Sequence, residues 1–133
     1  MDNHSTPDEL ANVTHKPVRG NIRISPAVLI QLMELTVNSV EGVSGLRSLR
    51  KHYDRREPEN GAHSHDNGKV AVSVSGDQID ASVSIAIIQG NSVSGITEEI
   101  RKRIGFAAGS MLGMTVRTAD IYVDEITSVT TPF

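Results

Sequence analysis

The sequence predicts an α+β protein in which two helices and a sheet form a two-layer sandwich. Two stretches repeat apolar residues every three or four positions, which is typical of helices that bury one face. Four other stretches alternate apolar with polar residues, which is typical of half-buried strands. Packing the helices on the sheet covers both kinds of apolar face. The predicted order is β-α-β-β-α-β, the order of a ferredoxin-like topology, and it leaves the order of strands within the sheet open.

The chain has 133 residues, a length that suits one domain with a single core. Residues 1–18 are polar and follow no apolar period, so we expect a disordered tail. Residues 19–127 are expected to form the domain, and residues 128–133 a second, short tail.

The domain is predicted to open with a strand that passes directly into a helix. Residues 21–24 alternate apolar with polar side chains, and Ser25 and Pro26 are typical of a helix cap and a first helical position. Apolar residues continue to Val40, so we expect a mostly buried helix with a narrow polar stripe. Gly42 is expected to end it.

A long loop and a β-hairpin are predicted next. Residues 47–69 hold several turn-forming residues and no apolar period, so we expect a mobile surface loop. Residues 70–75 and 79–87 then alternate on either side of a turn at Gly76-Asp77. They predict a hairpin that buries one face and carries mostly small Ser and Ala side chains on the other.

A second helix is predicted over residues 92–112, and alternation over residues 116–123 predicts the last strand. The inward stripe of the helix is expected to consist of Val93, Ile96, Ile100, Ile104, Ala107 and Met111. Gly105, Gly109 and Gly113 follow at four-residue spacing, although a glycine inside a helix costs about 1 kcal/mol relative to alanine. Such a ridge lets another backbone approach closely. That backbone is either the chain's own first helix or sheet, or a second subunit.

Composition excludes several classes of protein. The chain has no cysteine, which excludes disulfides, thiolate metal sites and a cysteine nucleophile and fits a reducing compartment. The N-terminus lacks the basic start and apolar run of a secretory signal. No window approaches the ~18 consecutive apolar residues of a membrane span, so we expect none.

The charge is unevenly distributed along the chain. The net charge is -3, which argues against DNA as a partner because neutralisation of phosphates carries most of that affinity. Residues 47–56 nevertheless carry a local charge of +4. This candidate interaction patch, which is either an anion-binding surface or a solvated loop, consists of Arg47, Arg50, Lys51, Arg55 and Arg56.

Two blocks of the chain have a familiar pattern. The first is GNIRISPAVLIQLMELTVNSVEGVSGL at residues 20–46, and the second runs from Lys69 to Ile126 through VSGDQIDASVSIAI, ITEEIRKRI and MLGMTVRTADIYVDEI. The more specific pieces are the Ser-Pro opening of the helix that ends in EGV, and the closing strand with its preceding glycine. In pattern and order, both blocks resemble the alkaline shock protein family of bacterial envelope-stress proteins.

This resemblance implies a small cytoplasmic protein without enzymatic activity, from Gram-positive-type bacteria. It implies that the protein self-associates and docks beneath the cell membrane, at its inner face, through a membrane-anchored partner. It implies no catalytic site and no cofactor. The chain departs from the family pattern in the Arg- and His-rich residues 47–69 and in its glycine-spaced second helix.

Metal binding and catalysis have weaker support in the sequence. His63, His65 and Asp66 resemble a metal-ligand cluster, to which His52 would add a fourth ligand. They stand among Gly, Asn and Pro residues, which do not hold ligands in place, so we expect a solvated linker and no metal. Neither a Gly-x-Ser-x-Gly elbow nor a Gly-x-Gly-x-x-Gly fingerprint occurs.

RNA binding is the alternative function. Gly42-Val43-Ser44-Gly45 follows a helix and precedes basic residues, as does the Gly-x-x-Gly clamp of a KH-type module. Its two middle residues are uncharged, no clear helix follows, and the net charge of the chain is negative. A helix C-terminal turn is therefore the simpler interpretation of these residues.

Overall fold

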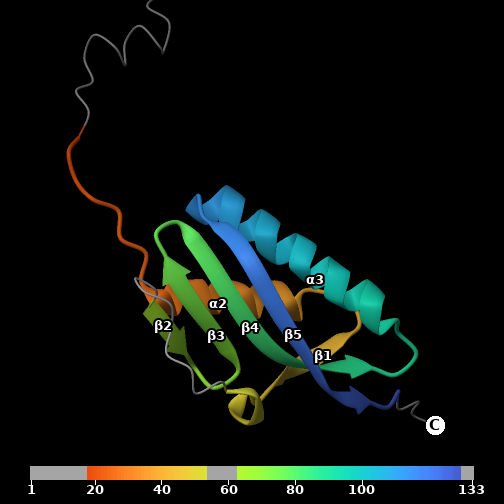
Figure 1. Ribbon diagram of the computed structural model, residues 1–133. Coiled ribbons are helices and arrows are strands. Elements are labelled where there is room, and N and C mark those ends of the chain that lie inside the picture. Colours follow the sequence, from red (N-terminus) through yellow and green to blue (C-terminus); the bar gives the residue numbers. More distant parts are fainter. Residues whose placement is uncertain (1–17, 54–62, 130–133) are drawn as a thin grey trace, which may run out of the picture.

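The computed structural model describes residues 18–53 and 63–129, which form a single sheet with two helices on one face (Figure 1). The helices are α2 (Pro26–Asn38) and α3 (Val93–Ala107), and α3 continues into a π-helical turn, η2 (Ala108–Leu112). The predicted α+β class and two-layer arrangement are confirmed. The predicted tails lie outside the described residues, except at residues 18, 128 and 129.

The sheet is built around β4 (Gln78–Ile88). One edge of β4 pairs antiparallel with β3 (Val70–Ser75) and, further along, with β1 (Val43–Arg47). The short strand β2 (His63–Asp66) pairs with β3, and β5 (Thr115–Thr127) runs parallel to the whole length of β4 along its other edge. Parallel neighbours need a crossover connection, and α3 provides it.

The core lies between the helices and the sheet and is almost entirely aliphatic, as the composition requires. The predicted hairpin is confirmed in β3 and β4, and its turn contains Gly76 at a φ of +62°. The largest fully buried apolar side chains of the two helices and of β4 are Met33, Val37, Ile79, Ile85, Ile87, Ile100 and Ile104.

The strand predicted at residues 21–24 is wrong. Within the described residues this segment pairs with no strand, and it runs away from the start of α2 (Figure 1), so the element order is α-β-β-β-β-α-β. Ile22 is 93% exposed, whereas Ile24 packs against the core. The alternating pattern is therefore present without a partner strand. Ser25 does adopt the extended backbone of a cap before Pro26, with φ -70° and ψ 148°.

The single mobile loop predicted at residues 47–69 is also wrong in its described parts. The strand β2 and a 3-10 turn, η1 (Arg50–His52), lie in this interval, and Leu49 is only 1% exposed. The Leu49 amide donates to the Gly68 carbonyl at 2.8 Å, which ties the two ends of the interval together. Residues 54–62 lie outside the described residues.

Both helices expose more apolar surface than their patterns predict. In α2, Val28 and Leu35 are 43% and 71% exposed, so its outer stripe is not purely polar. The inward stripe of α3 runs through Ile96, Ile100, Ile104 and Ala108, while Val93 and Met111 are 46% and 70% exposed. Both lie off this four-residue stripe, which is why their predicted burial is wrong.

Candidate functional site

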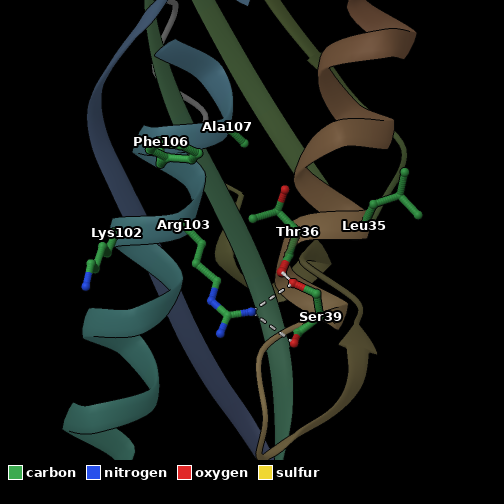
Figure 2. A pocket seen from close by; sticks show the side chains of 7 residues that line it. All are labelled: Leu35, Thr36, Ser39, Lys102, Arg103, Phe106 and Ala107. Atoms are coloured by element: carbon green, nitrogen blue, oxygen red, sulfur yellow. Dashed lines mark hydrogen bonds between the residues drawn. The ribbon is translucent and has the colours of Figure 1, made fainter. Parts of the chain in front are cut away.

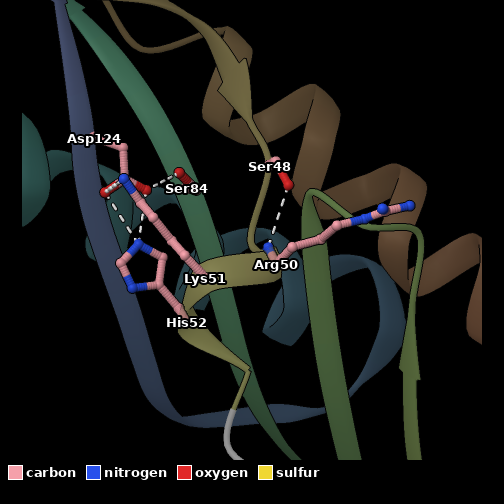
Figure 3. A network of polar contacts seen from close by, with 6 residues as sticks. All are labelled: Ser48, Arg50, Lys51, His52, Ser84 and Asp124. Atoms are coloured by element: carbon pink, nitrogen blue, oxygen red, sulfur yellow. Dashed lines mark hydrogen bonds and ion pairs between the residues drawn. The ribbon is translucent and has the colours of Figure 1, made fainter.

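Acidic side chains of β5 neutralise part of the predicted basic patch. Arg47 Nη2 lies 2.8 Å from Glu125 Oε2, and this bond lowers the pKa of the glutamate. Lys51 Nζ lies 3.2 Å from Asp124 Oδ1, whereas the Arg50 side chain points away from this network (Figure 3). Two of the five predicted cations therefore belong to intramolecular ion pairs.

The remainder of the patch is small. Arg50 is exposed and forms no ion pair with any other described residue. Arg55 and Arg56 lie outside the described residues. An anion-binding role for the patch stays a prediction. Because Arg47 and Lys51 are paired, fewer cations are available for it than the sequence alone suggests.

His52 anchors η1 to the outer face of the sheet, the face opposite the helices. Its Nε2 lies 3.0 Å from Oδ1 and 2.8 Å from Oδ2 of Asp124, and its ring stacks on Tyr122 with the centroids 3.8 Å apart. The Ser84 hydroxyl donates to the same carboxylate (Figure 3). Burial would raise the pKa of Asp124, but the hydrogen bonds from Ser84, His52 and Lys51 outweigh it and lower this pKa to about 2.

Ser84, His52 and Asp124 are the residue types of a hydrolytic triad, but they are not arranged as one. In a triad the serine hydroxyl bonds to one histidine nitrogen and the carboxylate bonds to the other. Here the carboxylate lies between the serine and the histidine, and Ser84 is 0% exposed. The cluster fixes η1 on the sheet and presents no accessible nucleophile.

The predicted Gly-x-x-Gly clamp of the RNA-binding alternative is wrong. Gly42 is buried at a φ of +97°, where a Cβ atom would lie 2.8 Å from Ile96 Cδ1 and 3.1 Å from the Asn91 side chain. Gly45 lies within β1, opposite Ala86. Gly42 therefore belongs to the turn that follows α2, in agreement with the helix C-terminal turn predicted as the simpler interpretation. The motif does not form an exposed loop.

The predicted histidine cluster lies on an edge strand rather than in a linker. Residues 63–66 form β2, and Asp66 Oδ1 accepts a hydrogen bond from Tyr53 Oη at 2.8 Å. His52, the suggested fourth ligand, is bonded to Asp124 instead. Within residues 18–53 and 63–129, no group of three or more His, Asp and Glu side chains is placed to hold a metal ion.

The glycine ridge on α3 and η2 is open. A Cβ atom at Gly105 would have no neighbour within 4 Å, and one at Gly109 would meet only Met114 O at 4.0 Å. Packing of the ridge on the chain's own first helix or sheet is therefore wrong. Gly113 ends η2 at a φ of +65°, a conformation that favours glycine. Contact of Gly105 and Gly109 with a second subunit stays a prediction.

An apolar groove lies between α2 and α3, where the sequence pattern indicates no site (Figure 2). It encloses about 480 Å³, and Leu35 and Phe106 stand on its two sides, 71% and 76% exposed. The Arg103 side chain reaches from α3 to the end of α2, where its Nη1 donates to Ser39 O at 3.2 Å. The groove is lined by Leu35, Thr36, Ser39, Lys102, Arg103, Phe106 and Ala107.

A second, polar groove of about 530 Å³ lies on the outer face of the sheet, and Asp120 and Tyr122 of β5 contribute to it. On its floor, Asp80 accepts hydrogen bonds from Arg117 Nη2 at 2.6 Å and from Thr118 Oγ1 at 2.7 Å, which lower the pKa of Asp80. Asp120 is exposed and forms no ion pair with any described residue. It is therefore available to a cation from outside.

Comparisons with known proteins identify a family but no individual relative. The model of the alkaline shock protein 23 family, described as having a cell envelope-related function, matches residues 14–128. No curated protein was matched by sequence.

Among solved structures, the chain is similar to variants of the MamM CTD. A copper form is 13% identical with a TM-score of 0.42, and the match covers 76% of this chain and 98% of that one. A manganese form is 14% identical with a TM-score of 0.40, covering 76% of this chain and 99% of that one. At these identities and TM-scores, the similarity supports no conclusion about the function of this chain.

Within the described residues, no helix is both long and apolar enough to cross a membrane. The family match covers nearly the whole chain, including the helices and the sheet that form the two grooves. It confirms the resemblance seen in the two sequence blocks. The chain therefore belongs to the alkaline shock protein 23 family, a family with a cell envelope-related function.

Proposed function

We propose that this chain is a non-enzymatic interaction protein of the cell envelope, which self-associates and docks onto a membrane-anchored partner. The observation that carries the proposal is the apolar groove between α2 and α3. Phe106, one of only four aromatic residues in the chain, is 76% exposed beside it, and Leu35 is 71% exposed opposite. Apolar surface with a polar rim is typical of protein contacts, and aromatic side chains often dominate their energy.

The charges at the groove indicate what kind of partner segment fits. Lys102 is exposed at the rim, while Arg103 already bonds to Ser39 and lies 3.5 Å from Glu99. A helix with an apolar stripe and an acidic residue beside it would cover Leu35 and Phe106 and place its carboxylate near Lys102. Helix-in-groove recognition of this kind needs no cofactor and no chemistry.

Two features of the polar network support a role without catalysis. The Ser84 hydroxyl is buried and engaged with a carboxylate, so it is not available for nucleophilic attack. The pKa of Asp124 is about 2, so this carboxyl group is ionised at neutral pH and poorly suited to general acid or base catalysis.

Co-sedimentation with native membranes tests the docking. The Leu35→Ser/Phe106→Ser double variant should lose at least nine-tenths of the membrane-associated fraction, because both anchors are truncated, an order-of-magnitude loss typical of hot-spot residues. Met111→Ser is the matched control, since Met111 is also an exposed apolar residue, at 70%, but does not line the groove.

Two results would contradict docking through a protein. One is a double variant that sediments with membranes as the wild type does. The other is wild-type chain that binds protein-free vesicles of the same lipids as well as it binds native membranes.

A further inference from the structure

We propose that residues 19–23 of one copy of the chain add as a strand to the free edge of β5 in a second copy. The inference rests on the proposed self-association and specifies the contact that produces it. It joins three observations, which are an unpaired segment with a strand pattern, a long strand with one free edge, and a match in charge and polarity between the two.

The donor segment has a strand's side-chain pattern without a strand's pairing. In an extended chain, Ile22 and Ile24 point to one side and Arg19 and Arg23 to the other. Ile22 is 93% exposed, so the described part of the chain buries almost none of it. Adding this segment to a sheet would cover the isoleucine and pair the backbone groups of both strands.

The acceptor is the outer edge of β5. This strand has 13 residues and bonds to β4 along one edge, and no described strand pairs with its other edge, which forms the margin of the sheet (Figure 1). An unpaired edge presents a row of amide and carbonyl groups to an added strand. Arg101 Nε donates to the Ala119 carbonyl at 3.2 Å, which leaves the stretch beyond Ala119 for pairing.

Side-chain chemistry matches the donor to this edge. Pairing with β4 places Ile121 and Val123 on the helix side of the sheet and Asp120 on the outer side. An antiparallel strand with Arg23 opposite Asp120 places Ile22 opposite Ile121, where it extends the apolar layer on the helix side. Asp120 is an exposed carboxylate that forms no ion pair with a described residue, so it can pair with Arg23.

The other edge of the sheet is a poorer acceptor. Its strands, β1 and β2, have only five and four residues, and the carboxylate of β2, Asp66, already accepts a hydrogen bond from Tyr53. The donor of the same chain is also badly placed for its own β5. Ile24 is held beside Leu112 and Met114, before β5 begins, and residues 18–23 lead away from the sheet (Figure 1). A second copy is therefore the natural acceptor.

Disulfide cross-linking tests the contact directly, because the chain has no cysteine of its own. Full-length Arg23→Cys and Asp120→Cys chains are mixed under mild oxidation. Neighbouring strands place paired Cα atoms ~4.5–5.5 Å apart, a distance that a disulfide spans. The mixture should give a cross-linked heterodimer at least ten times faster than the matched pair Arg50→Cys and Asp120→Cys, since Arg50 is exposed but outside the donor.

A charge swap gives a second, independent measurement. Arg23→Asp and Asp120→Arg should each weaken self-association about tenfold in sedimentation equilibrium, because each places like charges side by side. The double variant Arg23→Asp/Asp120→Arg should restore it, and all three should keep the wild-type Tm because both side chains are exposed.

The outcomes separate this contact from self-association in general. The strand addition is overturned if every charge variant associates as tightly as the wild type and no heterodimer cross-link forms preferentially. Self-association itself would then still stand. A wild-type chain that stays monomeric at all concentrations would overturn both proposals.

Discussion

Asp124 shows how one residue fixes a whole segment of the chain. Its pairing with β4 is interrupted, since Val123 faces Ile85 and Glu125 faces Ala86, so Asp124 is the extra residue of a β-bulge. Alternation from Val123 places its carboxylate on the outer face, where three donors from η1 and β4 meet it. The sequence pattern did not indicate the network because it does not show that η1 packs on this face.

The lowered pKa of Asp124 predicts a specific pH dependence of stability. Because the folded-state pKa is about 2 and the ordinary value is 3.8, the carboxylate stabilises the fold above pH ~4, and this contribution disappears as the pH falls toward 2. Asp124→Asn should lower the free energy of unfolding at pH 7 by about 1 kcal/mol after allowance for solvent screening. Urea unfolding at several pH values measures it.

Glu125→Gln is the matched control for that experiment. Glu125 also accepts a bond from a basic residue, but its side chain is 48% exposed, so its effect should be small. An Asp124→Asn chain that loses as much stability as the wild type between pH 4 and pH 2 would contradict the assignment.

Among the elements, those with long periodic patterns were predictable. Both helices and the β3–β4 hairpin follow from spacing alone because each buries a continuous apolar stripe. β2 could not be predicted, since its four polar residues are held by backbone pairing with β3. The strand expected at residues 21–24 failed for the opposite reason, because an alternating pattern does not supply a partner strand.

The helix formed by α3 and η2 predicts opposite effects for two of its glycines. Gly105→Ala should stabilise the chain by about 1 kcal/mol, because alanine favours the helix and nothing lies within 4 Å of the new Cβ atom. Gly113→Ala should destabilise it by at least about 1 kcal/mol, because its φ is +65°. Thermal unfolding of both variants at low protein concentration checks this, and a destabilised Gly105→Ala monomer would show that the ridge is not open.

Leu49 tests whether the segment between β1 and η1 is part of the fold. Its side chain is 1% exposed, so Leu49→Ala should cost about 2–3 kcal/mol of unfolding free energy. Arg50→Ala, at the exposed neighbouring position, should stay within about 0.5 kcal/mol of the wild type. Equal effects of the two changes would support the mobile loop that the sequence alone predicts.

At the scale of the whole molecule, the fold class and the family were accessible from the sequence, but the candidate site was not. An apolar period shows which residues share a helix face and not which of them a neighbour covers. The sequence therefore does not distinguish Leu35 and Phe106 from other helix residues. Their exposure beside one groove is visible only in the packing of α2 against α3. The basic patch shows the converse, since Arg47 and Lys51 are neutralised by β5 residues far along the chain.

The two proposed contacts use different surfaces, which predicts that they can be separated. Leu35→Ser/Phe106→Ser should lose membrane docking and keep self-association, because the groove lies on the helix layer. Arg23→Asp should weaken self-association about tenfold and leave the groove itself unchanged. Sedimentation equilibrium and membrane co-sedimentation of both variants check this. Loss of membrane docking by Arg23→Asp would mean that docking requires the oligomer. Loss of self-association by Leu35→Ser/Phe106→Ser would mean that the groove also joins copies of the chain.

The most direct test of the central claim is site-specific photo-cross-linking at position 106 in the source cell, with position 50 as the exposed control. The account predicts one dominant adduct from position 106, to a membrane-anchored protein, and none to that protein from position 50. The absence of any protein adduct at position 106, or adducts to RNA instead, would contradict the claim that the groove between α2 and α3 docks a protein of the cell envelope.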